Sequence, residues 1–122
     1  MKTFEDLDVW KKAREVRMYI YHITKKFPPE ERYGITGQIK RSSRSITNNI
    51  AEGYGRYHYQ ENIQFCRISR GSLTETLDHM IVSLDENIID SQTMIEFRIL
   101  YTDCLRLLNG YIAYLQKSKL GS

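Results

Sequence analysis

The sequence predicts an all-α fold, an antiparallel up-down-up-down four-helix bundle formed by a single domain over residues 1–122. Apolar residues recur at steps of three and four almost throughout, which is the helical period. Only 2 prolines and 7 glycines occur, too few for the many turns of an all-β fold. The 122 residues are 41% hydrophobic and 27% charged, a composition typical of one soluble domain.

The first helix is predicted between an acidic start and a pair of prolines. We expect Asp6 or Asp8 to cap it and Pro28-Pro29 to end it, because proline lacks the backbone donor and restricts the preceding residue. Its predicted inner face comprises Leu7, Trp10, Ala13, Val16, Ile20, Ile23 and Phe27.

The second helix is predicted to open at Pro29-Glu30-Glu31, since proline suits a first helical turn and acids favour the positive end of the helix dipole. The glycines of Gly53-Tyr54-Gly55 are expected to end it. Its predicted inner face comprises Ile35, Ile39, Ser42, Ile46, Asn49, Ile50 and Gly53.

The third helix is predicted from about Tyr59, followed by a turn over residues 87–91. Its predicted inner face comprises Phe65, Ile68, Ser72, Leu73, Thr76, Leu77, Met80 and Leu84.

The fourth helix is expected to start at Thr93, which has a capping-box spacing to Glu96. Its predicted inner face comprises Met94, Phe97, Tyr101, Cys104, Leu108, Tyr111 and Leu115. The connections between the four helices are short, so neighbours must be antiparallel.

The net charge of +3 is too small for a nucleic-acid coat protein, but it is unevenly distributed. Residues 38–70 carry six basic and two acidic residues, whereas residues 71–103 carry seven acids and one base. These faces either neutralise each other within the fold or between subunits, or leave a basic patch for phosphate. On charge alone we favour neutralisation.

Cysteine usage and hydropathy bear on the compartment. Cys66 and Cys104 lie in apolar-periodic surroundings without zinc-ligand spacing, so we expect buried thiols in a reducing compartment. The N-terminus is too acidic for a signal peptide. The longest uncharged stretch near the C-terminus, residues 107–116, is too short to span a bilayer. We therefore expect a cytoplasmic protein without a membrane partner.

Motifs for catalysis fail on spacing. No histidine follows a glutamate at the Glu-x-x-His spacing of a bundle di-iron site, and no nucleophile elbow or phosphate loop occurs. Glu75, Asp78 and His79 share one helix face, but no second histidine cluster completes a metal site. The sequence therefore predicts a non-enzymatic protein with no catalytic residues, no metal and no cofactor.

Small and polar residues interrupt the apolar faces of the second and third helices. We expect Asn49, Glu52, Ser72 and Glu75 to form a buried hydrogen-bonded layer, with Gly71 permitting close helix approach. The alternative is a functional buried acid–base pair formed by Glu52 and Glu75. Because neither a nucleophile nor a metal site accompanies the pair, we favour the structural interpretation.

Basic residues form rows on two predicted helices and border an aromatic cluster. The candidate nucleic-acid-binding residues are Lys40, Arg41, Arg44 and Arg56, followed by Lys11, Arg14 and Arg17. Arg56 lies among Tyr54, Tyr57 and Tyr59, and arginine with tyrosine can hold phosphate and stack on unpaired bases. Arg41 has a second possible role, as an interior partner of Glu75. The alternative for the whole set is solvated helix faces and a packed loop.

Apolar residues outside the inner faces predict a homo-oligomer, because a monomeric bundle needs only one apolar face per helix. These residues are Tyr19, Tyr21, Ile88, Ile89, Leu100, Leu107 and Tyr114.

Several blocks over about residues 4–116 resemble the bacterial four-helix bundle family named for a protein encoded in 23S rRNA intervening sequences. The blocks are Phe4-x-x-Leu7-x-Val9-Trp10, Phe27-Pro28-x-x-Glu31-x-Tyr33-Gly34, Gln38-Ile39-Lys40-Arg41-Ser42, Ser45-Ile46, Asn49-Ile50-Ala51-Glu52-Gly53-Tyr54-Gly55-Arg56 and Gly71-Ser72-Leu73-x-Glu75. The resemblance implies antiparallel bundles that assemble into pentameric barrels, with no established catalytic residues. A relative, the accessory protein of diversity-generating retroelements, binds reverse transcriptase and nucleic acid through a basic surface.

Residues and resemblance together lead us to expect a non-enzymatic homo-oligomer, a pentamer by the resemblance, that binds or scaffolds nucleic acid or a ribonucleoprotein. Its expected partners are copies of itself and RNA or DNA. The alternative is a purely structural protein-interaction module without nucleic-acid binding.

Overall fold

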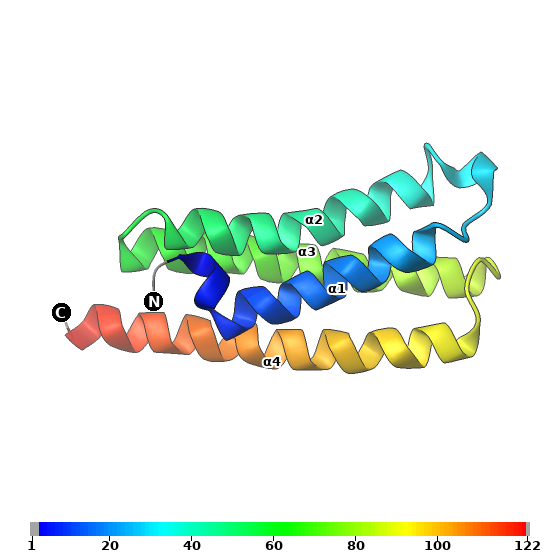
Figure 1. Cartoon of the computed structure of the whole chain (residues 1–122). Helices are drawn as coiled ribbons and strands as arrows, with labels where there is room; N and C mark the ends of the chain where they lie inside the picture. The colour runs from blue at the N-terminus through cyan, green and yellow to red at the C-terminus, as the bar shows by residue number, and fades with distance from the viewer. Residues whose placement is uncertain (1–2, 122) are drawn as a thin grey trace.

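A computed structural model describes residues 3–121 and confirms the all-α four-helix bundle (Figure 1). Residues 1–2 and 122, the ends of the predicted 1–122 domain, lie outside the described residues. The helices are α1 (Asp8–Thr24), α2 (Ile35–Tyr54), α3 (Tyr59–Asp85) and α4 (Ser91–Gly121), with short 3₁₀ turns η1 (Phe4–Asp6) and η2 (Pro29–Glu31). Successive helices run in opposite directions, so both described chain ends lie at the same end of the bundle.

Each helix packs against the helices before and after it, and α1 also packs against α4, which closes the bundle. The largest fully buried side chains are Phe97, Ile20, Ile39, Ile46, Ile50, Ile63, Leu73, Met80 and Leu108. Both cysteines are also buried. None of the described helices combines the length and the hydropathy that a bilayer crossing requires.

Two predicted helix starts are wrong. Neither Asp6 nor Asp8 caps α1: its N-cap is Leu7, which makes no side-chain bond, and Asp6 instead completes a capping box with Thr3 at η1. Pro29 begins the separate turn η2, and α2 starts only at Ile35.

The start of α4 is also shifted, because Asp90 caps the helix in place of Thr93. Asp90 Oδ1 accepts hydrogen bonds from the Thr93 backbone N (2.8 Å) and hydroxyl (2.7 Å). These bonds hold the pKa of the Asp90 carboxyl below its usual value. Glu96, the predicted capping-box partner, accepts a 2.9 Å bond from the Tyr19 hydroxyl on α1.

Hydroxyl groups join α2 to α3. Ser42 and Thr76, both buried, share a 2.8 Å hydrogen bond between their hydroxyl oxygens. Ser69 donates a 2.7 Å bond across the interface to the Ile46 carbonyl. The Ser42 and Thr76 hydroxyls also bond to the Ile39 and Ser72 carbonyls of their own helices, so these buried polar groups are hydrogen-bonded.

The predicted polar layer is therefore only half right. Ser72 donates a 2.8 Å bond to the Ser45 hydroxyl, and the Asn49 amide donates to the same serine. Glu52 and Glu75, in contrast, lie at exposed positions, so the half-buried layer contains hydroxyls and an amide and neither carboxylate. Glu52 and Glu75 therefore form neither part of a buried hydrogen-bonded layer nor a buried acid–base pair, because both interpretations required these side chains to be buried.

The close approach of α2 and α3 occurs at Gly53, not at Gly71. A Cβ at Gly53 would lie 2.7 Å from Asn62 Oδ1 and 2.9 Å from Phe65 Cβ. Gly71 is exposed, and a Cβ there would meet nothing within 4 Å. The expectation that Gly71 permits helix contact is wrong.

The apolar surface differs from the predicted set. Most of the predicted off-face residues, including Tyr19, Leu100 and Leu107, pack against the core. Tyr21 and Tyr114 are exposed as expected, at 42% and 61%. Ile68, predicted on the inner face of the third helix, is 53% exposed. Ile95 and Ile99, one turn apart on α4, are 55% and 61% exposed.

Candidate nucleic-acid interface

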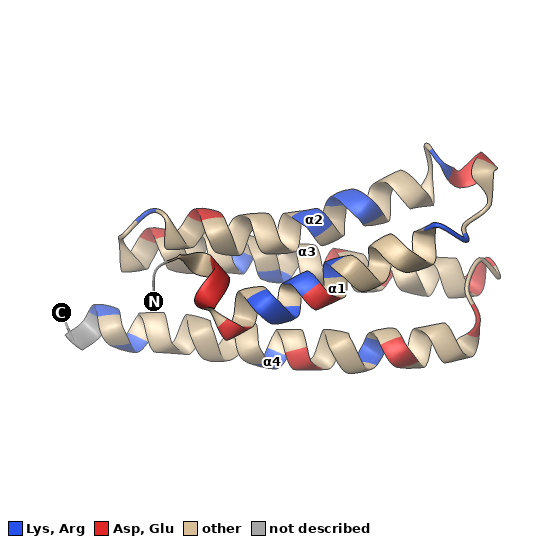
Figure 2. Ribbon diagram, viewed as in Figure 1, with Lys and Arg blue, Asp and Glu red and all other residues tan. Residues whose placement is uncertain are grey.

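A groove runs between α1 and α2, and most of the predicted basic residues line it. We call it the α1–α2 groove; it comprises two open hollows of about 590 and 160 Å³ that share Arg17 and Arg44. Its lining residues are Phe4, Trp10, Arg17, Met18, Tyr21, Lys40, Arg41, Ser43, Arg44, Ser45, Thr47, Asn48 and Ala51. No Asp or Glu is among these described lining residues. Figure 2 shows basic residues gathered in the middle of the two helices.

Helical spacing brings these side chains together. On α1, Trp10, Arg14, Arg17 and Tyr21 follow one another at steps of four, three and four, and therefore share one helix face. On α2, Arg41, Arg44 and Asn48 follow one another at steps of three and four, and Lys40 lies four residues before Arg44. Because the helices are antiparallel, Trp10 meets the C-terminal half of α2, whereas Tyr21 meets its N-terminal half.

Arg17 occupies the centre of the groove. Its Nη1 donates a 3.0 Å hydrogen bond to the Thr47 hydroxyl, which fixes the guanidinium against α2. Burial lowers the pKa of Arg17 below its usual value, and the positive charges of Arg14 and Arg44 lower it further. The guanidinium of Arg17 is thus repelled by the guanidinium groups of Arg14 and Arg44. An anion such as phosphate would relieve that repulsion and accept several N–H donors at once.

The structure brings five of the seven predicted binding residues to one region. Arg17, Lys40, Arg41 and Arg44 line the groove, and Arg14 adds its charge beside Arg17. Lys11 is exposed on α1 but is not one of the lining residues.

Arg56 does not join this cluster. It lies beyond the end of α2, with its guanidinium 5.0 Å from the centre of the Phe65 ring and Nη1 3.8 Å from Glu61 Oε2. Arg56 therefore lies outside the α1–α2 groove that Arg44 lines, and its role in nucleic-acid binding stays a prediction.

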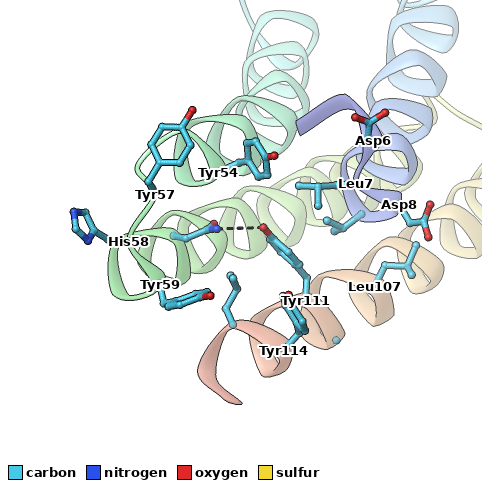
Figure 3. A pocket seen from close by; sticks show the side chains of 14 residues that line it. Asp6, Leu7, Asp8, Tyr54, Tyr57, His58, Tyr59, Leu107, Tyr111 and Tyr114 are labelled. Carbon is cyan, nitrogen blue, oxygen red and sulfur yellow. Dashed lines mark hydrogen bonds between the residues drawn. The ribbon is translucent and has the colours of Figure 1, made fainter. Parts of the chain in front are cut away.

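A separate pocket of about 630 Å³ lies at the end of the bundle (Figure 3). The start of α1, the α2–α3 turn and the C-terminal half of α4 meet there. Its lining residues are Asp6, Leu7, Asp8, Val9, Tyr54, Tyr57, His58, Tyr59, Asn62, Leu107, Gly110, Tyr111, Tyr114 and Leu115. The Asn62 amide donates a 3.1 Å bond to the Tyr111 hydroxyl. This tyrosine pocket carries two aspartates and, among its described lining residues, neither Lys nor Arg, so it does not suit phosphate.

Sequence reasoning did not connect the aromatic residues with the groove. Trp10 packs against the core, as its predicted place on the inner face requires, but it is only half-buried and also borders the arginines. The signal was present in the steps from Trp10 through Arg14 and Arg17 to Tyr21. Those steps place two aromatic and two basic residues on a face adjoining the core face.

The other candidate cluster, on α3, is a surface pair. His79 Nε2 lies 3.2 Å from Glu75 Oε2, one helical turn away. Within the part of the chain that the structure describes, no group of three or more metal-ligating side chains could hold an ion.

Fold and groove together define a small all-α bundle protein with a basic, aromatic-edged cleft between its first two helices. The chain belongs to the 23S rRNA-intervening sequence protein family, whose model matches residues 5–110. The crystal structure of a protein with unknown function from the S23 ribosomal protein family of Bacteroides thetaiotaomicron is similar, with a TM-score of 0.78 at 23% identity. That match covers 85% of this chain and 97% of the other and supports the fold. No curated protein matches the sequence significantly.

Proposed function

We propose that the protein is a non-enzymatic, cytoplasmic homo-oligomer, a pentamer, whose α1–α2 groove binds the phosphate backbone of nucleic acid. The observation that carries this proposal is the cluster of Arg14, Arg17 and Arg44. Arg17 and Arg44 line the groove, and the positive charges of Arg14 and Arg44 both act on Arg17. The described residues that line the groove include no carboxylate.

Phosphate contacts of this kind position a nucleic acid without reading its bases, so the binding is largely independent of sequence. A net charge of +3 per chain gives one groove only weak affinity. Grooves repeated around a ring act together through effective concentration. Exposed Ile95 and Ile99 on α4 support assembly, because isoleucines one turn apart form an apolar surface that contact with a second copy would bury.

The second candidate function is a protein-interaction module without nucleic-acid binding. The tyrosine pocket favours it, since a pocket of about 630 Å³ lined by aromatic residues and two aspartates suits an apolar or cationic side chain of a partner. Salt dependence separates the two functions, because only phosphate binding releases condensed counterions.

The experiment that tests the proposal measures the affinity of a short labelled RNA by fluorescence anisotropy over a series of salt concentrations. The wild type is compared with Arg17→Gln/Arg44→Gln and with a control, Arg98→Gln/Arg106→Gln, which removes two exposed charges from α4. Each lost phosphate contact should flatten the slope of log affinity against log salt by roughly 0.7 for a single strand.

The groove variant is expected to bind weakly with a flatter slope, whereas the control keeps the wild-type slope. Circular dichroism of both variants checks that they retain their helices. If the groove variant and the wild type bind the labelled RNA with equal affinity at low salt, the groove does not bind phosphate. That result would favour the protein-interaction module.

A further inference from the structure

We propose that the α1–α2 groove prefers single-stranded nucleic acid, with an unpaired base stacked on the Trp10 indole and the adjoining phosphates on Arg17 and Arg44. This inference rests on the proposed function and adds the class of nucleic acid and the residue that selects it.

Trp10 is placed to offer a fixed stacking surface beside the arginines. It is half-buried and lines the same hollow as Arg17 and Arg44. Phe4 packs against it with ring centres 5.2 Å apart and the rings inclined at 62°, an edge-to-face arrangement. Phe4 and Trp10 together therefore form a rigid aromatic wall at one end of the basic cluster, and little side-chain entropy is lost when a base stacks there.

The other end of the groove is also aromatic. Tyr21 lines the smaller hollow with Arg17 and Lys40, and its ring is 42% exposed. Lys25 Nζ lies 4.5 Å from the centre of that ring. Trp10 and Tyr21 are eleven residues apart on α1, which is roughly 16 Å at 1.5 Å per residue. The groove thus alternates an aromatic ring, a basic centre and a second aromatic ring, as surfaces that bind single strands do.

A duplex does not match this arrangement. Its bases already stack on one another, so the aromatic rings would have no base face to contact and only the arginines would bind. A single strand contacts both parts of the groove. Asn48, exposed and in the same hollow as Trp10, adds an amide that can hydrogen-bond the edge of a stacked base.

The chain contains a single tryptophan, so fluorescence excited at a wavelength that tyrosine does not absorb reports on Trp10 alone. The wild-type protein is titrated with a short oligothymidylate, with a duplex of equal length and with inorganic polyphosphate, which has phosphates but no bases. All three should bind at low salt. We expect strong quenching of Trp10 by oligothymidylate and little change with polyphosphate, even when polyphosphate displaces a labelled oligothymidylate.

Variants test the stacking contact by affinity. Trp10→Leu should weaken labelled oligothymidylate binding by roughly 5- to 150-fold, the range expected for one lost base–aromatic stack. Its duplex and polyphosphate binding should change less than twofold. Trp10→Tyr keeps an aromatic face and should recover much of the lost affinity. Tyr114→Leu, which removes an exposed aromatic of the tyrosine pocket, is the matched control and should bind as the wild type does.

Three results would overturn the inference while leaving the proposed function intact: unchanged Trp10 fluorescence at saturating oligothymidylate, equal quenching by polyphosphate, or equal oligothymidylate affinity of Trp10→Leu and the wild type. If none of the three polyanions binds at low salt, the proposed function fails and the inference fails with it.

Discussion

Arg17 on α1 donates a 3.0 Å hydrogen bond from Nη1 to the hydroxyl of Thr47 on α2. The Thr47 hydroxyl in turn donates a 3.2 Å bond to the carbonyl of Arg44. One threonine therefore fixes the guanidinium of Arg17 and bonds the backbone of a second groove arginine. A guanidinium held before its ligand arrives loses less freedom on binding, so this contact prepares the groove for an anion.

The charge of Arg17 is expected to favour binding but not folding. Arg14 and Arg44 repel it, whereas Gln at this position keeps a hydrogen-bond donor without the charge. Arg17→Gln should change the free energy of unfolding in urea by no more than about 0.5 kcal/mol. Moderate salt, which screens the repulsion, should stabilise the wild type more than this variant. A loss well above 1 kcal/mol would make Arg17 a structural residue.

Thr76→Val should destabilise the protein by about 1–3 kcal/mol, because it removes the hydroxyl that shares a 2.8 Å bond with buried Ser42. Valine has nearly the same shape, so the loss reports the hydrogen bond. Glu75→Ala, at the exposed neighbouring position, should stay within about 0.5 kcal/mol of the wild type. Chemical denaturation measures both. Equal losses in the two variants would contradict the placement of the polar layer.

Gly53 and Gly71 should respond in opposite directions to alanine. Gly53→Ala should cost about 1–3 kcal/mol, since its Cβ would lie 2.9 Å from Phe65 Cβ and 3.1 Å from the Asn62 carbonyl oxygen. Gly71→Ala should gain about 0.5–1 kcal/mol, because it adds helix propensity at an exposed site with nothing within 4 Å. Thermal unfolding of both variants decides the point.

Alkaline pH should destabilise the protein through its buried thiols. Burial raises the pKa of both Cys66 and Cys104 from 9.0 to about 12. Each thiol is therefore ionised more easily in the unfolded chain, and its contribution to stability is complete below pH 9.0 and is lost between pH 9.0 and about 12.

Urea denaturation at several pH values measures this loss, which is at most about 1.4 kcal/mol per pH unit for each thiol. Cys104→Ala should make the free energy of unfolding fall less steeply with pH, because one of the two titrating thiols is absent. This change in slope does not depend on the stability of the variant at neutral pH. In the folded wild type, both thiols should resist a thiol reagent at neutral pH. A variant slope equal to that of the wild type would show that Cys104 does not titrate as a buried group.

The sequence predicted the bundle because helical periodicity and two prolines are local signals. It predicted the inner faces less well. The predicted inner face of the third helix included both Ile68 and Leu73, yet Ile68 is 53% exposed while Leu73 is fully buried. Hydrophobicity alone does not reveal how far a helix is rotated against its neighbours, and that rotation is fixed by packing. Gly53 shows the same limit, since only the position of Phe65 on α3 makes its missing Cβ necessary.

The sequence identified the basic residues that are candidates for binding, but it could not show which of them lie close together in space. Arg44 and Arg56 carry the same charge and lie twelve residues apart, and only the antiparallel placement of α1 beside α2 unites Arg44 with Arg17. Glu52 and Glu75 were misplaced for a related reason. A polar residue in an apolar pattern is buried only if partners face it, and the serines and threonines there satisfy one another.

The last prediction concerns assembly. Ile95 and Ile99 are 55% and 61% exposed on one face of α4, so we expect this face to contact a second copy. Ile95→Lys/Ile99→Lys should lower the oligomer to a 14.5 kDa monomer in light scattering, because two ammonium groups cannot be buried without partners. The control Ser91→Lys/Gln92→Lys adds the same charge at exposed positions near the start of α4 and should leave the oligomer intact.

The same variant separates assembly from binding. A monomer retains one intact groove, so a short oligonucleotide should bind to it as to the wild type. A long RNA spans several grooves of an oligomer and should lose affinity on dissociation, because the effective concentration of neighbouring grooves disappears. A wild type that scatters as a 14.5 kDa particle at all micromolar concentrations would refute the oligomer itself. An oligomer that survives both lysines would instead move the contact to another surface, such as that around Ile68 on α3.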